Sequence, residues 1–139
     1  MKELVIEAEV DNLDKVFEFI DSQLEKYDCP PKIQWQINLA VEELFVNIAH
    51  YAYHPNKGSA TIKFDILEDS SMISIIFIDE GKPYNPLEKP DPDISLPAEE
   101  RDIGGLGIFM VKKYVDNIFY KYHDGKNILT IQKHLKEMK

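Results

Sequence analysis

The chain has 139 residues, of which 16 are Lys or Arg and 25 are Asp or Glu, and its formal net charge is −9. This acidic balance argues against nucleic acid or an anionic membrane surface as a partner, because both attract basic proteins. The single cysteine excludes an internal disulfide and a cysteine-rich zinc site. No apolar run approaches the roughly 20 residues of a membrane span, and the N-terminus lacks a signal-peptide pattern. We therefore expect one cytoplasmic domain covering residues 1–139.

Hydrophobic periodicity predicts a strand, two helices and two further strands in the first eighty residues. The expected ranges are 4–10 for the first strand, 13–27 for the first helix, a second helix between Pro31 and His54, and 60–66 and 72–78 for the next strands. Asp11 or Asn12 can cap the first helix. The strand at 72–78 is almost wholly apolar, which predicts burial on both of its faces.

The periodic pattern stops at residues 80–103, a stretch with five of the eight prolines. A segment of that length inside a compact domain is usually a functional lid or disordered. A short apolar helix is expected at 108–115, and strands at 118–123 and 128–135 are joined by a turn containing Asp-Gly. This order predicts an α+β fold, a two-layer sandwich whose helices cover one face of a mixed, mostly antiparallel sheet.

The second helix carries a polar stripe beside its apolar face. Glu43 and Asn47 lie about 40° apart on the helical wheel, and His50 returns to within about 20° of Glu43. An ordinary solvated helix flank is the simpler interpretation of this spacing. The alternative is a site in which the amide oxygen of Asn47 binds a hard cation such as Mg²⁺ and the carboxylate of Glu43 acts as a general base.

A second cluster, Asp79-Glu80-Gly81-Lys82-Pro83, directly follows the most apolar strand. Such a segment can be a plain turn, because Gly and Pro are common in turns. Yet an acidic residue at the end of a buried strand requires solvent or a hydrogen-bond donor. Asp79 is therefore a candidate to accept a hydrogen bond from a ligand's amino group at the floor of a cleft, with Gly81 allowing a close backbone approach.

Three of the six glycines, Gly104, Gly105 and Gly107, open the third helix. They can form a flexible hinge for the preceding segment. They can also expose successive backbone N–H groups at the positive end of the helix dipole, which is an anion site of the kind that receives phosphates. The cluster is neither a Walker A loop nor a Rossmann fingerprint.

Taken in order, the three clusters resemble the motifs of the Bergerat-fold, histidine-kinase-like ATPases. Residues 42–50 resemble the N box, Asp79-Glu80-Gly81 the first glycine box and Gly104-Gly105-Leu106-Gly107 the second. Within that group the sequences of residues 79–86, 104–108 and 127–130 are most similar to those of the small anti-sigma-factor serine/threonine kinases. The resemblance covers essentially the whole chain.

The resemblance implies a Bergerat ATPase fold with an ATP lid at about residues 82–103, and ATP and Mg²⁺ as cofactors. It implies that Glu43 is catalytic and polarises the attacking hydroxyl, and that Asn47 is the Mg²⁺ ligand. The remaining nucleotide-binding residues that it implies are His50, Asp79, Gly81, Arg101, Gly104, Gly105, Gly107 and Thr130. Thr130 is expected to support Asp79, and Arg101 is the nearest arginine before the second glycine box, with Asp102 and Ile103 between.

Three functions remain open at this point. The first is an anti-sigma factor that transfers the γ-phosphoryl group of ATP to a Ser or Thr of a small antagonist protein in a partner-switching pathway. The second is a nucleotide-binding anti-sigma or regulatory interaction module with little or no kinase turnover, and the third is a scaffold that no longer binds nucleotide. The expected partners are a sigma factor, a small antagonist protein or both, and a second copy of the chain, with no direct nucleic-acid contact and no membrane.

Overall fold

A five-stranded antiparallel sheet forms one layer of the computed structural model, which describes residues 1–67, 69, 71–88 and 105–135. The strands are β1 (Lys2–Glu7), β2 (Ser59–Leu67), β3 (Met72–Asp79), β4 (Asn117–His123) and β5 (Lys126–His134). Their order is β1-β2-β3-β5-β4, and every neighbouring pair is antiparallel. The central strand is β3. Its C-terminal end therefore lies in the middle of the row that the strand ends form on one side of the sheet.

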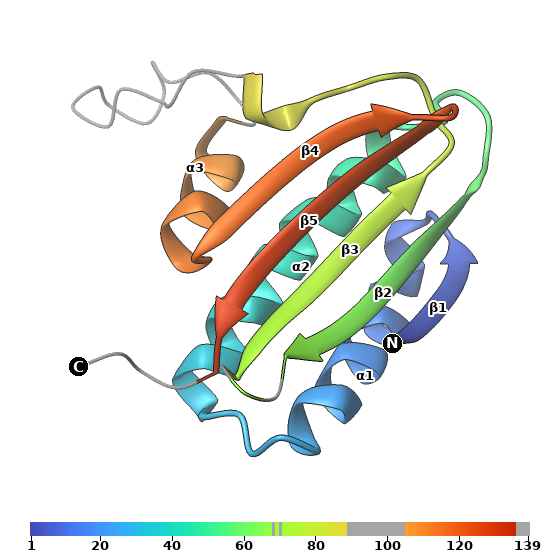
Figure 1. The fold of residues 1–139 in the computed structure, drawn as a ribbon. Helices are drawn as coiled ribbons and strands as arrows, with labels where there is room; N and C mark the ends of the chain where they lie inside the picture. The colour runs from blue at the N-terminus through green and yellow to red at the C-terminus, as the bar shows by residue number, and fades with distance from the viewer. Residues whose placement is uncertain (68, 70, 89–104, 136–139) are drawn as a thin grey trace.

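Three helices form the second layer: α1 (Leu13–Glu25), α2 (Pro31–Tyr51) and α3 (Gly105–Tyr114). Figure 1 shows all three behind the same face of the sheet, with α2 crossing behind its centre. Short 3₁₀ turns lie at Val10–Asn12 (η1) and Pro86–Glu88 (η2). The predicted two-layer α+β sandwich is therefore confirmed. No helix among the described residues is long and apolar enough to cross a membrane.

The core lies between the two layers and is formed by the apolar faces that the periodicity predicts. The fully buried side chains with the largest volumes are Phe45, Phe77, Ile20, Leu24, Ile37, Ile62, Ile73, Ile75, Ile131, Val16, Val41 and Val111. Most come from α1, α2 and the three central strands. Burial of this apolar area anchors α2 to the sheet, so the positions of its polar residues are fixed.

The prediction that the strand at 72–78 is buried on both faces is wrong. Alternate residues of β3 face the helices and are buried, whereas Ile76 and Ile78 on the opposite face are only half-buried. No described segment covers that face of the sheet (Figure 1). The apolar run therefore reflects an uncovered sheet face rather than a second layer of helices.

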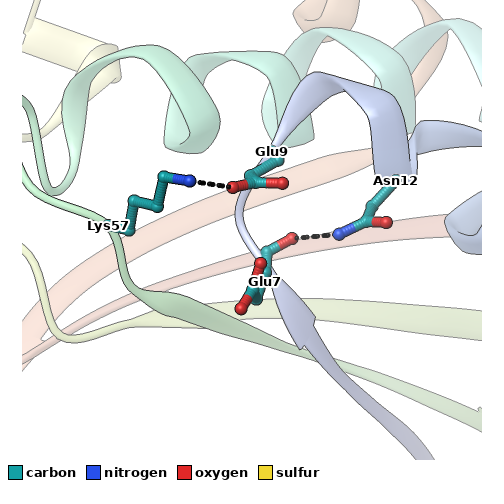
Figure 2. A network of polar contacts seen from close by, with 4 residues as sticks. All are labelled: Glu7, Glu9, Asn12 and Lys57. Carbon is teal, nitrogen blue, oxygen red and sulfur yellow. Dashed lines mark hydrogen bonds and ion pairs between the residues drawn. The ribbon is translucent and has the colours of Figure 1, made fainter.

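The connection between β1 and α1 also differs from the prediction. The strand ends at Glu7 instead of Val10, and Asn12, at the N-cap position of α1, makes no side-chain capping hydrogen bond. Instead, its Nδ2 donates to the carbonyl of Glu7 at 3.0 Å (Figure 2). Lys57 forms an exposed ion pair with Glu9 at 3.2 Å beside it, an interaction that contributes little to stability.

Candidate functional site

A cavity opens between α2 and the C-terminal half of β3, beside the β4–β5 hairpin. Its walls are mainly apolar, and two buried polar side chains, Asp79 and Asn127, face it. The lining residues are Leu44, Asn47, Ile48, Tyr51, Ala52, Phe77, Asp79, Lys82, Tyr84, Pro86, Tyr120, Asn127 and Leu129. An apolar pocket with a few convergent polar groups is the usual form of a small-molecule site.

Asp79, the last residue of β3, is only 6% exposed. Its Oδ1 accepts hydrogen bonds from the backbone N–H of Gly81 and from Nδ2 of Asn127, both at 2.9 Å. Burial raises the pKa of this carboxyl above its ordinary value of 3.8, and these two hydrogen bonds oppose that shift. The side chain is thus a buried acceptor held in a fixed orientation.

The turn after β3 is fixed by three successive backbone N–H groups. That of Glu80 donates to the Tyr53 hydroxyl at 2.7 Å, that of Gly81 to Asp79, and that of Lys82 to the carbonyl of Ala52 at 3.1 Å. A Cβ atom on Gly81 would lie 2.2 Å from the Ala52 carbonyl oxygen. Only glycine allows this close approach between the turn and the end of α2.

The polar stripe on α2 is divided between two hollows. Asn47 lines the cavity that contains Asp79, whereas Glu43, one turn earlier, lines a groove between α2 and α3. His50 is exposed in the last turn of α2, where its ring meets that of Tyr51 edge-on, and it does not line the cavity. The structure thus brings Asn47 together with Asp79 and leaves His50 outside.

Glu43 and the second glycine box are in direct proximity. A Cβ atom built on Gly107 would lie 2.2 Å from Cδ and Oε1 of Glu43, so the carboxylate rests against the glycine backbone in the first turns of α3. The helix begins at Gly105, three residues earlier than predicted. A candidate general base and a candidate phosphate-binding helix end therefore meet.

Thr130 does not support Asp79, contrary to the prediction. It pairs with Ile76 and Phe119 on the face of the sheet that points away from the helices. The polar partner of Asp79 is Asn127, its opposite residue in the β3–β5 register. The sequence motifs do not include this residue, because the register of β3 with β5 joins segments far apart in the chain and no hairpin turn sets it.

Some predicted residues lie outside the described part of the chain. Arg101, Gly104 and most of the predicted lid (82–103) belong to this group. The beginning of that segment is described and forms one wall of the cavity, through Lys82, Tyr84 and Pro86.

Two tyrosine rings stand at the cavity wall. Tyr51 of α2 is 52% exposed, and its ring centroid lies 6.3 Å from that of Tyr84. The cavity between the walls holds about 50 Å³, which is less than the roughly 300–1,000 Å³ of typical ligand pockets. A ligand larger than a few atoms therefore requires the residues around the cavity to move apart.

Comparison with known proteins agrees with this fold. Residues 6–133 match the family of the histidine kinase-like ATPase domain, and the chain belongs to that family. The class predicted from the three motifs is therefore confirmed.

Among curated relatives, the chain is similar to the serine/threonine-protein kinase BtrW of Bordetella bronchiseptica. The two are 23% identical over 103 residues, which cover 74% of this chain and 72% of BtrW. This chain is also 30% identical over 97 residues to the serine-protein kinase RsbW of Bacillus mycoides and to that of Bacillus cereus. These matches cover 67% of this chain and 59% of either RsbW, so the chain spans little more than half of those relatives.

Two solved structures share the fold. The histidine kinase domain of a blue-light activated kinase from Erythrobacter litoralis matches 76% of this chain and 46% of its own, with a TM-score of 0.54 and 16% identity. The histidine kinase AdeS of Acinetobacter baumannii matches 99% of this chain and 70% of its own, with a TM-score of 0.53 and 14% identity. At these identities the likeness concerns the fold alone.

The raised pKa of Asp79 predicts that Asp79→Asn keeps or raises stability at neutral pH. The pKa of Asp79 in the folded protein lies above the ordinary 3.8, so the buried charge costs stability at any pH above the folded-state pKa. This cost fades as the pH falls through the folded-state pKa toward 3.8. The free energy of unfolding by urea, measured from pH 7 to pH 4, should favour the variant most at pH 7. Asp69→Asn, at an exposed turn, is the matched control. A variant less stable than the wild type at pH 7 would contradict this prediction.

Proposed function

We propose that the chain binds Mg·ATP in the cavity beside Asp79 and acts as an ATP-dependent serine/threonine protein kinase. The observation that carries the proposal is the arrangement on α2, where Asn47 faces the cavity while Glu43, one turn away, rests against Gly107. A nucleotide-binding residue and a candidate base thus stand at neighbouring positions of one rigid helix. Such fixed positioning is what phosphoryl transfer requires of a protein.

The adenine base is assigned to the cavity, whose walls must move apart to admit it because the cavity holds about 50 Å³ in this structure. The carboxylate of Asp79 can accept a hydrogen bond from the exocyclic amino group, and the apolar walls of Leu44, Ile48 and Phe77 can contact the ring. The turn at Gly81 brings backbone against the end of α2 at the same place. A buried polar group that matches one ligand group gives strong selectivity, because a ligand without that group leaves it unpaired.

Asn47 fits the binding of Mg²⁺ by its chemistry. Mg²⁺ prefers oxygen donors and is usually held by one or two protein groups together with substrate phosphates and water. The amide oxygen of Asn47 on the cavity wall is such a donor. When bound, the ion would neutralise charge on the phosphates, which an acidic chain of net charge −9 otherwise repels.

Glu43 is assigned the role of orienting the nucleophile. Its carboxylate lines the groove between α2 and α3, so a hydroxyl that enters along this groove can donate its proton to the carboxylate. Gly105 and Gly107 at the start of α3 offer backbone N–H groups to the phosphates. Arg101 and Gly104 keep the nucleotide-binding roles that the motif resemblance implies. His50 keeps its implied role as well, from the last turn of α2 outside the cavity.

The named relatives support a protein substrate. BtrW and RsbW are named serine/threonine-protein and serine-protein kinases, and the motif wording resembles the anti-sigma-factor kinases. We infer that the partners are a sigma factor and a small antagonist protein that carries the phosphorylated Ser or Thr. A regulatory module that binds nucleotide with little turnover is the second candidate, which the apolar groove beside Glu43 also suits.

We also propose a homodimer that covers the open face of the sheet. On this face Ile78 of β3 lies opposite Ile128 of β5, and Thr61 of β2 and Lys121 of β4 continue the same cross-strand row. Phe119 of β4 and Val5 of β1, on the outer strands, are 54% and 64% exposed. Large apolar side chains exposed on an uncovered sheet face favour an interaction surface, and two-fold dimers are the commonest solution.

Asn47→Ala should weaken Mg·ATP binding by at least about tenfold, because the variant loses an oxygen donor to a charged ligand. The helix should stay intact, since Ala is the better helix former. Isothermal titration calorimetry measures the affinity. Asn38→Ala, on the same helix but not on the cavity wall, is the matched control. Equal affinities of Asn47→Ala and the wild type would refute the assignment of Asn47.

Glu43→Gln should lower the rate of phosphoryl transfer about 10²–10⁴-fold, the usual contribution of a positioned general base. ATP affinity should survive, because the variant keeps the size of the side chain. The measurement is transfer of ³²P from [γ-³²P]ATP to the antagonist protein. Glu42→Gln, at an exposed neighbouring position, should have little effect. Transfer by Glu43→Gln at the wild-type rate would place the base elsewhere.

Phe119→Lys should convert the dimer to a monomer, because it replaces an exposed apolar ring of the proposed interface with a charge that the dimer would bury. Multi-angle light scattering at micromolar concentration gives the mass. Trp35→Lys is the matched control, since Trp35 is equally exposed, at 56%, but lies on the helical side. A wild-type protein with the mass of one chain would refute the dimer.

A further inference from the structure

Asn127 lies where the cavity, the β4–β5 hairpin and the first residues of the predicted lid meet. It is 6% exposed and stands opposite Asp79 in the β3–β5 register. Its Nδ2 donates to Oδ1 of Asp79 and to the carbonyl of Lys82, both at 2.9 Å, and lies 3.4 Å from the carbonyl of Gly81. Its Oδ1 accepts from the backbone N–H of Tyr84 at 3.1 Å and from the hydroxyl of Tyr120.

This side chain has no hydrogen-bonding capacity left for a ligand. A carboxamide offers two N–H donors and two acceptor lone pairs. The two donors are used by Asp79 and the carbonyls of the turn, and the two lone pairs by Tyr84 and Tyr120. Asn127 lines the cavity but acts on a ligand only through the groups that it holds.

The orientation of the amide is determined by its neighbours. The backbone N–H of Tyr84 can only donate, and an ionised Asp79 can only accept. A flipped amide would set donor against donor and acceptor against acceptor, so the oxygen must face Tyr84 and the nitrogen must face Asp79. The hydroxyl of Tyr120, from the neighbouring strand β4, donates to the same oxygen and holds it there.

The two ends of the amide therefore connect two parts of the site. The nitrogen fixes the carboxylate at the cavity floor and the carbonyl of Lys82, while the oxygen fixes the backbone of Tyr84. Residues 82–84 form the start of the predicted lid (82–103), and Gly81 directly precedes them. One buried side chain on β5 thus fixes both the orientation of the Asp79 carboxylate and the position of this cavity wall.

We propose that Asn127 is a positioning residue for nucleotide binding, which aims Asp79 at the base and anchors residues 81–84 as the cavity wall, with Tyr120 fixing its orientation. The proposal rests on the proposed binding of ATP in this cavity. It assigns to Asn127 and Tyr120 a role that the three sequence motifs do not contain.

Asn127→Asp separates the two ends of the side chain. A carboxylate at position 127 can still accept from Tyr84 and Tyr120, but it has no N–H to donate and opposes the carboxylate of Asp79. We expect ATP affinity by calorimetry to fall by at least about tenfold. Hydrogen exchange of the Tyr84 amide, measured without nucleotide, should stay as slow as in the wild type.

Asn127→Leu and Tyr120→Phe complete the series. Asn127→Leu removes both ends, so ATP affinity should fall and the Tyr84 amide should exchange at least about tenfold faster. Tyr120→Phe removes one hydroxyl and is the variant most certain to fold; its ATP affinity should fall about three- to tenfold. The matched control is Asn117→Asp, which adds the same charge to an exposed position of β4, where Asn117 donates to Gln132. It should bind ATP like the wild type.

Two results would overturn the proposal: ATP affinity of Asn127→Asp equal to that of the wild type, or unchanged exchange of the Tyr84 amide in Asn127→Leu. A merely structural role would lower the midpoint of thermal unfolding while the folded variants keep the wild-type affinity, which also contradicts it. A wild-type protein that binds no ATP would refute the proposed function instead, while the exchange of Tyr84 would still decide whether Asn127 anchors the wall.

Discussion

A buried carboxylate at the end of the central strand is the constraint on which the site depends. Asp79 lies where β3 leaves the core, and a charge at 6% exposure persists only if donors surround it. The backbone N–H of Gly81 and the amide of Asn127 provide them. The register of β3 with β5, the glycine in the turn and the contact of that turn with α2 all follow from this requirement. The buried charge of Asp79 therefore lowers the stability of the fold at the position that offers an acceptor to a ligand.

The α2 helix connects this carboxylate to the rest of the site. Its apolar face is anchored in the core through Ile37, Val41 and Phe45, so its polar residues cannot shift independently. Asn47 then faces the cavity, and Glu43 faces the groove toward α3. Binding and catalysis are assigned to residues one helical turn apart, and a protein substrate can reach Glu43 along the groove without entering the cavity.

Much of this arrangement could be predicted from local sequence, because helical and strand periodicity report which residues face the core. The α2 face, the alternation in β2 and the Asp-Gly hairpin are local signals, and the structure contains each of them. The errors have a different origin. The uncovered face of β3 and the partner of Asp79 depend on which strands are neighbours and in which register. The family resemblance implied Thr130, but Thr130 and Asn127 are three residues apart and therefore on opposite faces of β5, and only Asn127 is on the face of Asp79.

Base selectivity tests the central claim most directly, because an acceptor at the cavity floor distinguishes an amino group from a carbonyl. The measurement is the calorimetric affinity of the wild-type protein for ATP and for inosine triphosphate, which carries an oxygen in place of the exocyclic amino group. With Asp79 as the acceptor, inosine triphosphate should bind at least about tenfold more weakly than ATP. Equal affinities would show that Asp79 does not contact the base, and would contradict the assignment of this cavity to adenine.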